Sequence, residues 1–395
     1  MLRIELADSA GELEAVQSFR YKVYVDEMGK PMAEADHERK MVVDAADERG
    51  HVFAAYDDGE LVGTLRLSVG LESMAQDPHL AIYDLGLFSD VDSGQIAFAT
   101  RFMLRRDYRG SMAAHRLALA ALEFAQSTRV RLALIYCAPY LVSYYEQMGF
   151  RRYTNNFQDE LGYRIPMVMV LFDREYLQAV KSPLLERLPP DPPGENWHSW
   201  FAERFSEFVI PVNSRLVSTE EFYQLLNYKL HDDPLSSIPL LRGLAKEEAD
   251  HVLKAGTVIQ CRVGDTIIRT GEHSSEIYLN LSAMVGVRAP ATDRVISVLG
   301  PGELLGEMAF LLGSTRTADV TVLKDGDLLV LSEKTLAHLI EKLPVIASKL
   351  MVNLARILAE RLATTTRSLA EHVAIGSGEP AAIGQRDPAA MPTRS

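Results

Sequence analysis

The residues best suited to chemistry fall into two groups, and the more telling group lies at 302–322. Gly306 and Glu307 follow an apolar run there, and Arg316 returns on the far side of a short turn. A guanidinium group can grip a phosphate through two parallel hydrogen bonds, and free backbone N–H groups of a turn can add to that grip. An ionised carboxylate has only acceptor lone pairs, so Glu307 suits a sugar hydroxyl. A ribose that carries a cyclised phosphate would use all three features.

This stretch resembles the phosphate-binding cassette of cyclic nucleotide-binding domains, with Gly-Glu-x-Ala at 306–309 and Arg-Thr-Ala at 316–318. The resemblance implies that Glu307 binds the ribose 2′-hydroxyl and that Arg316 binds the cyclic phosphate. It also puts the Thr317 hydroxyl within reach of the purine, which suits cAMP and cGMP alike and leaves the base open. The predicted cyclic nucleotide site comprises Gly306, Glu307, Met308, Ala309, Arg316, Thr317 and Ala318.

The second group begins where a predicted strand meets a predicted helix at Arg109-Gly110-Ser111. Small residues at such a turn let the backbone approach a ligand, and the helix N-terminus offers N–H groups to a phosphate. The turn resembles the acyl-CoA-binding motif of GCN5-related N-acetyltransferases, except that Met112 stands where the middle glycine is expected. The resemblance implies a donor site made by Leu104, Arg105, Arg106, Arg109, Gly110, Ser111, Met112, Ala113 and Ala114.

Tyr-Glu-x-x-Gly-Phe at 145–150 resembles the closing motif of the same fold. It implies that Tyr145 protonates the leaving thiolate, although ordinary packing between helix and sheet would also explain a tyrosine there. The resemblance further implies a mixed sheet flanked by helices, so the whole chain is expected to be an α+β protein.

Residues 19–29 resemble the first helix of acyl-homoserine-lactone synthases and long-chain N-acyl amino acid synthases, in which Arg20 and Tyr24 match an acceptor-binding pair. Further matches along the chain are Asp44 with Asp47, Arg66 with Leu67, and Thr100-Arg101-Phe102. The lactone synthases carry a glutamate where Phe98 stands here, and their usual tryptophan after the first helix is missing. Both departures favour another amine acceptor, such as an amino acid.

These matches suit amide formation, because attack on a thioester needs a held amine, a proton acceptor and donors for the oxyanion. Asp44 and Asp47 could hold an ammonium group, while Arg66 or Arg101 could hold a carboxylate through two hydrogen bonds. The alternatives are solvated turn aspartates and strand arginines that face water.

An arginine-rich region in an otherwise acidic chain bears on the acyl donor; its members are Arg101, Arg105, Arg106, Arg109 and Arg116. Such a patch suits the phosphates of coenzyme A or the acidic helix of an acyl carrier protein. Met112 in place of glycine should crowd a pyrophosphate, which favours the carrier protein.

The elements that must position the first group alternate between helix and strand through 1–180. Helices are predicted at 15–29, with Val16, Phe19, Val23 and Met28 buried, and at 112–128 and 140–148. Strands are predicted at 52–56, 61–69, 96–104, 132–138 and 167–172, with a hairpin turn at 57–60 and a helix C-cap at Gly149.

Residues 181–235 are predicted to separate the two domains, with a stiff proline-rich linker at 189–194 and an aromatic interdomain packing helix at 197–208. A lid or a carrier dock is the alternative for that helix. From 236 to 370, short strands punctuated by glycine predict a β-roll, followed by a helix at 336–369. Leu350, Leu354, Ile357 and Leu358 could cap the nucleotide or pair two chains, although packing on the roll is the more ordinary role for such a helix. Residues 371–395 are expected to be disordered.

The composition narrows the classes of function. The chain has 395 residues and a formal net charge of −13, which suits two domains and argues against nonspecific nucleic-acid binding. The predicted helix leads into the tail without a helix-turn-helix, so a transcription factor is not expected. Two distant cysteines form no metal motif, and neither a signal peptide nor a membrane span is recognisable, so we expect a metal-free protein of the cytoplasm.

The leading hypothesis is therefore an N-acyltransferase, using acyl-CoA or an acyl carrier protein thioester and a small amine acceptor, that responds to cAMP or cGMP. One alternative is a protein-lysine acetyltransferase under cyclic nucleotide control. The other is a non-catalytic sensor whose first domain keeps the fold and has lost its donor site.

Overall fold

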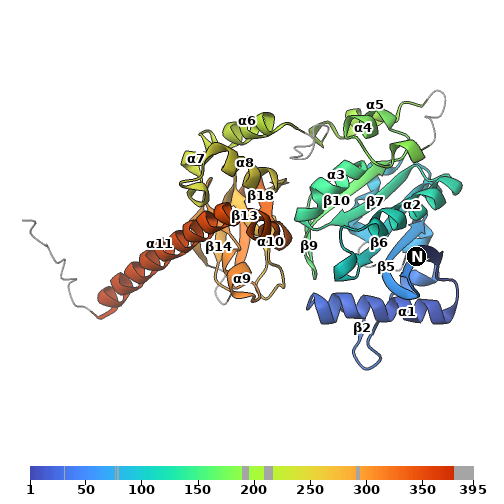
Figure 1. The fold of residues 1–395 in the computed structure, drawn as a ribbon, viewed down its shortest axis with the longest axis horizontal. Helices are drawn as coiled ribbons and strands as arrows, with labels where there is room; N and C mark the ends of the chain where they lie inside the picture. The colour runs from blue at the N-terminus through green and yellow to red at the C-terminus, as the bar shows by residue number, and fades with distance from the viewer. Residues whose placement is uncertain are drawn as a thin grey trace, which may run out of the picture.

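The computed structural model describes residues 1–30, 32–75, 77, 80–188, 195–208, 217–290 and 294–377, with side chains up to 370. Two domains lie side by side, and a long helix, α11 (Pro344–Ser377), extends from the second domain away from the first (Figure 1). The predicted α+β class with two domains is confirmed. The linker predicted at 189–194 and the tail beyond 377 lie outside the described residues.

The first domain is built on one mixed sheet, with the strand order β1-β4-β5-β6-β7-β10-β8 and with β9 paired to β10. Its parallel pair is β6 with β7, and the other described pairs in this sheet are antiparallel. The strands are β1 (Arg3–Leu6), β4 (His51–Asp57), β5 (Glu60–Val69), β6 (Ile96–Leu104), β7 (Leu132–Cys137), β8 (Phe150–Arg152), β9 (Phe157–Asp159) and β10 (Gly162–Val170). A separate small hairpin pairs β2 (Ala35–Asp36) with β3 (Met41–Val42).

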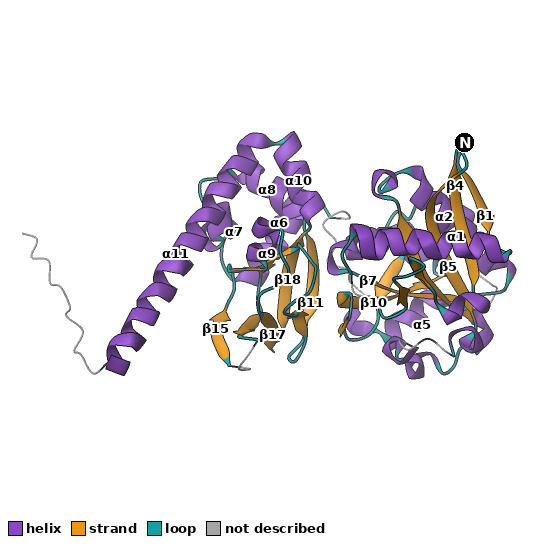
Figure 2. Ribbon diagram, turned by 90° about the horizontal axis from the view of Figure 1, so that it is seen from below, coloured by secondary structure: helices purple, strands orange, loops and turns teal. Residues whose placement is uncertain are grey.

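Helices cover both faces of this sheet because alternate side chains of a strand point to opposite faces. Phe53 and Ala55 of β4 pack in the cluster that includes α2, whereas Val52 and Ala54 pack with Val16 of α1. Figure 2 shows α1 lying across the sheet. The helices of this domain are α1 (Ala10–Tyr21), α2 (Met112–Ser127), α3 (Val142–Met148), α4 (Arg174–Ala179) and α5 (Trp197–Arg204).

Most predicted elements of the first domain are present, and their local causes are visible. The β4–β5 turn has left-handed backbone at Asp58 and Gly59, the φ pattern that a two-residue hairpin requires. Gly149 ends α3 with φ +118°. The first predicted helix differs: α1 stops at Tyr21, a π-helical segment follows at Lys22–Glu27, and Met28 is exposed where burial was predicted.

The end of the first sheet was only partly predicted. β8 and β9 are short strands that no periodicity marked, and β10 begins at Gly162, five residues before the predicted start. A strand of three residues carries too little alternation to be read from a sequence. These strands matter because β9 and β10 pack against β12 of the second domain.

The second domain is a β-roll of two four-stranded sheets, ordered β11-β18-β13-β16 and β12-β17-β14-β15. Its strands are β11 (Thr257–Cys261), β12 (Thr266–Ile268), β13 (Ile277–Asn280), β14 (Met284–Arg288), β15 (Val295–Leu299), β16 (Leu304–Leu305), β17 (Asp319–Lys324) and β18 (Gly326–Leu331). Its helices are α6 (Thr219–Leu230), α7 (Pro234–Ser237), α8 (Lys246–Lys254), α9 (Glu307–Leu312), α10 (Glu333–Lys342) and α11.

Helices α5 and α6, both within 181–235, belong to different domains. Phe201 of α5 packs on the first sheet together with Phe88 and Tyr153, whereas Phe222 and Leu226 of α6 pack in the core of the roll. The two cores also meet directly, because buried residues of β7, β10 and α3 share one hydrophobic cluster with residues of β11, β12 and β13. Helix α11 continues to Ser377, so the first residues of the predicted disordered tail are helical.

The described residues bear on two further questions, membrane insertion and metal binding. None of the helices there combines the length and the apolar character needed to cross a bilayer. In the same residues, His, Cys, Asp and Glu side chains do not gather in groups of three or more that could hold a metal ion.

Candidate functional site

Five of the predicted residues of the first domain form one chain of ion pairs. Asp47 lies 2.6 Å from Arg20 Nη1 and 3.3 Å from Arg66 Nη1. Asp44 Oδ2 lies 2.8 Å from the same Arg66 nitrogen and 2.7 Å from Arg101 Nη2, and it accepts a second hydrogen bond from Arg101 Nε at 2.8 Å. Ion pairs therefore connect four segments that are distant in sequence.

The two ends of this network differ in exposure. Arg20, Arg66 and Asp47 are buried, and Arg66 Nε is also fixed by donating to Thr100 Oγ1 at 3.0 Å. The side chains of Asp44 and Arg101 keep 11% and 13% of their surface exposed. Only the Asp44–Arg101 end can therefore reach a substrate in this arrangement, while the buried end holds it in place. This separates residues that the sequence grouped together as catalytic or acceptor-binding.

The charges of the network favour a cationic ligand. Glu34 Oε1 lies 3.1 Å from Arg101 Nη2, and Asp77 Oδ2 lies 3.7 Å from Arg66 Nη2. Four carboxylates thus face three guanidinium groups, which leaves one negative charge in excess. Burial alone would raise the pKa of Asp44, but Arg101 and Arg66 outweigh it and hold that pKa well below its ordinary value. Asp44 therefore stays ionised and is a poor proton acceptor at neutral pH.

An irregularity in β6 carries Arg101. Thr64 pairs with Met103 and Arg66 pairs with Thr100, so Arg101 and Phe102 bulge opposite one residue of β5, and Arg101 has φ +53°. On the other side of β6, the parallel register with β7 ends at Phe98 and Leu134, although both strands run on. The sheet is therefore unpaired between β6 and β7 next to the bulge.

Two tyrosines stand near this part of the sheet. The Tyr24 ring centre lies 5.8 Å from Arg101 Cζ, within the range of a cation–π contact. Tyr145 is half-buried on α3, where its ring packs against Tyr144 and Phe150. Burial raises the pKa of Tyr145 well above its ordinary value, so its hydroxyl keeps its proton at neutral pH. A protonated phenol suits the role of a general acid.

The predicted donor loop has the geometry of a helix start. Ser111 Oγ accepts from the Ala113 N–H at 3.1 Å and caps α2, and Gly110 precedes it with φ +83°. Leu104 and Ala113 are buried, whereas Ala114 is half-buried and Arg106 is exposed. Met112, which replaces the expected glycine, is 63% exposed, so its side chain is not part of the hydrophobic core.

The arginine-rich region is less basic than its sequence suggests. Arg105 lies 2.7 Å from Glu60 and 2.8 Å from Asp107, and Arg109 Nη2 lies 2.5 Å from Glu27. Arg116 Nη1 donates to the Leu2 carbonyl. An anionic donor would have to displace some of these carboxylates, a cost that a count of arginines does not reveal.

The candidate nucleotide site centres on Arg316, which is 3% exposed. Its Nε donates to Ser274 Oγ, its Nη1 to the Gly306 carbonyl and its Nη2 to the Glu276 carbonyl, each at 2.8 Å. The Glu276 carboxylate is more distant, at 3.4 Å from Nη2. A buried guanidinium group held mainly by neutral acceptors suits an anionic ligand, so Arg316 fits a phosphate.

Gly306 lies against this arginine, and Glu307 follows that glycine as the first residue of α9. Gly306 has φ +80°, and an added Cβ would lie 2.5 Å from Arg316 Nη1, so a larger residue would collide with it. Glu307 is buried, and its Oε1 accepts from Arg361 Nη1 of α11 at 2.7 Å. Ala309 is buried, Ala318 is half-buried, and Met308 and Thr317 are exposed. The seven residues thus lie between the start of α9 and the loop before β17, and Arg361 of α11 contacts Glu307 among them.

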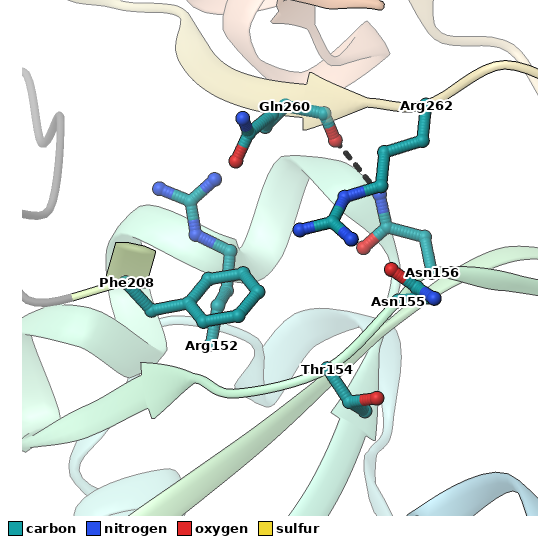
Figure 3. Close-up of a pocket in the computed structure, with 7 residues that line it drawn as sticks. All are labelled: Arg152, Thr154, Asn155, Asn156, Phe208, Gln260 and Arg262. Atoms are coloured by element: carbon teal, nitrogen blue, oxygen red, sulfur yellow. Dashed lines mark hydrogen bonds between the residues drawn. The ribbon is translucent and has the colours of Figure 1, made fainter. Parts of the chain in front are cut away.

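A pocket lined mainly by polar residues lies where the two domains meet (Figure 3). Asn156 Nδ2 of the first domain donates to the Gln260 carbonyl of the second at 2.8 Å. The two arginines that face this pocket already have carboxylate partners, Glu146 for Arg152 and Glu207 for Arg262. The pocket is therefore a feature of the domain contact.

Several residues of these sites had not been predicted. Glu34 and Asp77 belong to the ion-pair network, Ser274 and Glu276 hold Arg316, and Arg361 pairs with Glu307. No local pattern could have shown these partners, because each lies on another element. Arg361 alone left a trace, as a basic residue on a helix for which capping the nucleotide was one of the predicted alternatives.

Comparison with known families agrees with this division. Residues 15–173 match the family model described as N-acyl amino acid synthase FeeM, and residues 258–343 match that of the cyclic nucleotide-binding domain. The chain thus joins a domain that matches the FeeM family model to a domain that matches the cyclic nucleotide-binding model. Both resemblances expected from the sequence are confirmed at this level.

Individual relatives match parts of the chain. The cyclic AMP receptor protein of Thermus thermophilus is 36% identical over 130 residues, which are 31% of this chain and 57% of that protein. The Pycsar effector protein XpPycTIR of Xanthomonas perforans is 31% identical over 117 residues, 29% of this chain and 38% of that protein. The chain therefore spans about half or less of the length of these relatives.

Solved structures resemble each domain separately. The structure of FeeM, an N-acyl amino acid synthase from uncultured soil microbes, is 14% identical with a TM-score of 0.38, covering 48% of this chain and 99% of that one. The Thermus thermophilus catabolite activator protein is 34% identical with a TM-score of 0.31, covering 34% of this chain and 63% of that one.

Proposed function

We propose that this protein is a cytoplasmic N-acyltransferase that moves an acyl group from a thioester to the amine of a small acceptor, such as an amino acid, under the control of a cyclic nucleotide. The observation that carries the proposal is the partly exposed Asp44–Arg101 pair, held by a buried network beside the unpaired stretch of β6 and β7. The match of this domain to the FeeM family supports the same reaction.

The acceptor would bind at this pair through both of its charges. Arg101 uses Nε and Nη2 for its contacts with Asp44 and Glu34, which leaves Nη1 for a substrate carboxylate. The excess negative charge of the network attracts the ammonium form of the amine. A residue of each sign at one place favours an α-amino acid over an amine without a carboxylate.

In the transfer step, the neutral amine nitrogen attacks the thioester carbonyl carbon. The C–N bond forms, the C–S bond breaks, one amine proton passes to solvent, and Tyr145 gives its proton to the leaving thiolate. Tyr145 is protonated at neutral pH, because burial raises its pKa, so a proton is present for this transfer, and solvent then restores it. Arg101 and Asp44 orient the acceptor throughout.

The second domain would bind the regulatory nucleotide. Arg316 would hold the cyclic phosphate, Glu307 the ribose hydroxyl, and the turn at Gly306 would leave room for the phosphate. Cyclic nucleotide binding can regulate transfer only if its affinity differs between two states of the chain.

Acyl transfer by the purified chain tests this function. Acyl-CoA and acyl carrier protein thioesters would be offered with amino acids, with and without cAMP or cGMP, and the products identified by mass spectrometry. We expect N-acyl amino acids, and a loss of kcat/KM for the acceptor of about 10- to 150-fold in Arg101→Gln, the scale of a hydrogen bond to a charged group. The control Arg39→Gln changes an exposed arginine outside the site and should leave the rate unchanged.

Other results would contradict the proposal. Acetylated protein lysines in place of small amides would indicate a protein acetyltransferase. A chain that binds no acyl thioester would be a sensor without catalysis. Transfer that is indifferent to saturating cAMP and cGMP would remove the regulatory half.

A further inference from the structure

One short segment of the second domain, 272–276, contacts both the first domain and the candidate nucleotide site. It directly precedes β13. On the side of the first domain, Gln158 Nε2 of β9 donates to Glu272 Oε2 at 3.1 Å, and Lys30 Nζ donates to the His273 carbonyl. Lys30 is buried there, and its Nζ also donates to the Leu161 carbonyl at 3.1 Å.

The other side of the segment holds Arg316. The Arg316 side chain donates to Ser274 Oγ and to the Glu276 carbonyl, each at 2.8 Å. The backbones are paired as well, because the Arg316 N–H donates to the Glu272 carbonyl at 2.9 Å. A change in the position of the Arg316 side chain would therefore alter its hydrogen bonds with this segment.

The contact at Lys30 leads on to the acceptor end of the ion-pair network. The Lys30 N–H donates to the Tyr24 carbonyl at 2.8 Å, which ties Lys30 to the π-helical segment that carries Tyr24. The Tyr24 ring in turn lies 5.8 Å from Arg101 Cζ. A continuous series of contacts thus joins Arg316 to Arg101 through His273 and Lys30.

The number of N–H donors on Arg316 makes this series of contacts sensitive to a bound phosphate. A guanidinium group has five N–H donors, and Arg316 already uses four of them, counting the weaker contact with the Glu276 carboxylate. A bidentate phosphate needs two donors. Arg316 must therefore release at least one present partner, and three of its four contacts are to Ser274 and Glu276.

We propose that the segment 272–276 is the connector through which a cyclic nucleotide regulates acyl transfer, by moving the His273 carbonyl relative to Lys30 and so altering the acceptor site. This rests on the proposed function. It adds that regulation acts on the binding of the acceptor and passes through Lys30. The nearby contact of Lys334 Nζ, 3.4 Å from the position of a Cβ on Gly110, shows that the same domain face also reaches the donor loop.

The test breaks the connector at Lys30 without touching either site. Lys30→Met keeps most of the apolar stem and removes the ammonium donors. Lys254→Met is the matched control, because Lys254 Nζ also donates to a backbone carbonyl, that of Val217, but within the second domain. Binding of cAMP and cGMP is measured by calorimetry, and backbone hydrogen exchange is followed in peptides that cover 22–30.

We expect wild type and Lys254→Met to show nucleotide-dependent exchange at 22–30 and a change in the KM for the acceptor of at least 5-fold, the lower end of measured couplings. Lys30→Met should bind the nucleotide with wild-type affinity and change its KM by less than 2-fold. A response of Lys30→Met equal to wild type would overturn the connector. A wild-type chain that binds nucleotide without altered exchange would overturn it too, while a chain that binds neither nucleotide would overturn the proposed function with it.

Discussion

Arg101 and Arg316 each stand at the centre of a candidate site, yet their charges are balanced in different ways. The nearest partner of Arg101 is the Asp44 carboxylate, at 2.7 and 2.8 Å, and behind it lies a second ion pair between Asp47 and two buried arginines. The partners of Arg316 at 2.8 Å are a hydroxyl and two backbone carbonyls.

This difference indicates that the Arg101 network mainly positions groups, whereas Arg316 is available to bind an anion. Carboxylates cancel the charge of a buried arginine and fix its position, so the Arg101 network serves to orient groups. The shortest contacts of Arg316 are with hydroxyl and carbonyl groups, and its carboxylate partner, Glu276, lies farther away at 3.4 Å, so its positive charge is less closely compensated and an anion can exchange with these groups at a lower electrostatic cost. Loss of the buried end of the first site should therefore cause unfolding, whereas loss of Arg316 should reduce binding.

The largest effect is expected when the buried network is broken. Asp47→Asn removes the carboxylate between Arg20 and Arg66 and leaves both guanidinium groups without their shared partner, which should cost about 3–5 kcal/mol of unfolding free energy. Tryptophan fluorescence reports this domain directly, because the two tryptophans of the chain, Trp197 and Trp200, both lie in α5.

An exposed ion pair provides the comparison for that measurement. Glu14 and Arg39 lie 3.4 Å apart with more than half of each side chain exposed, so Glu14→Gln should change the stability by less than about 1 kcal/mol. Equal effects of the two substitutions would mean that burial does not distinguish the network from a surface pair.

The sequence carried more information about local elements than about the network. The hairpin turn at Asp58 and Gly59 and the start of α2 after Ser111 each depend on a few adjacent residues, and both were predicted. The cassette was predictable for a similar reason, since its glycine, glutamate and arginine all lie within the short stretch 306–316.

What could not be predicted was which charges meet. Asp44 and Arg101 both stood out, but as separate candidates for an ammonium and a carboxylate, and their pairing depends on the bulge in β6. Glu34 gave no local signal, since nothing in its neighbourhood repeats or caps an element. The burial of Arg20 and Arg66 likewise follows from tertiary packing, which a single sequence does not state.

A smaller effect, on binding and not on folding, is expected at the second arginine. Arg316→Ala should weaken cyclic nucleotide binding by about 1.5–3 kcal/mol, or roughly 10- to 150-fold, the scale of hydrogen bonds to a charged group. Calorimetric titration with cAMP and cGMP measures it. Arg269→Ala, at an exposed arginine of the same domain, should bind as wild type. Unchanged binding by Arg316→Ala would remove Arg316 from the site.

The smallest expected effect is a pH dependence of stability at Asp44, which distinguishes the two sites further. The pKa of Asp44 is held below its ordinary value of 3.8, so its ionised form is favoured in the folded state. A carboxylate of this kind stabilises the fold above its unfolded pKa, and that contribution is lost as the pH falls towards the folded pKa. The stability difference between wild type and Asp44→Asn should thus be constant from pH 5 to 7. Below pH 3.8 it should shrink by up to about 1.4 kcal/mol for each pH unit.

A substitution at the Arg316 site should change stability by the same amount at every pH, so this site provides the control. Ser274→Ala removes a hydroxyl that does not titrate in this range, so its stability profile should run parallel to that of wild type at every pH. Because both variants are compared with the same wild type, the titration of all other carboxyl groups cancels. A difference for Asp44→Asn that stays constant down to pH 2 would show that Asp44 is not held ionised by its arginines. The distinction between a charge-balanced scaffold and a dipole-lined receptor would then lose its electrostatic basis.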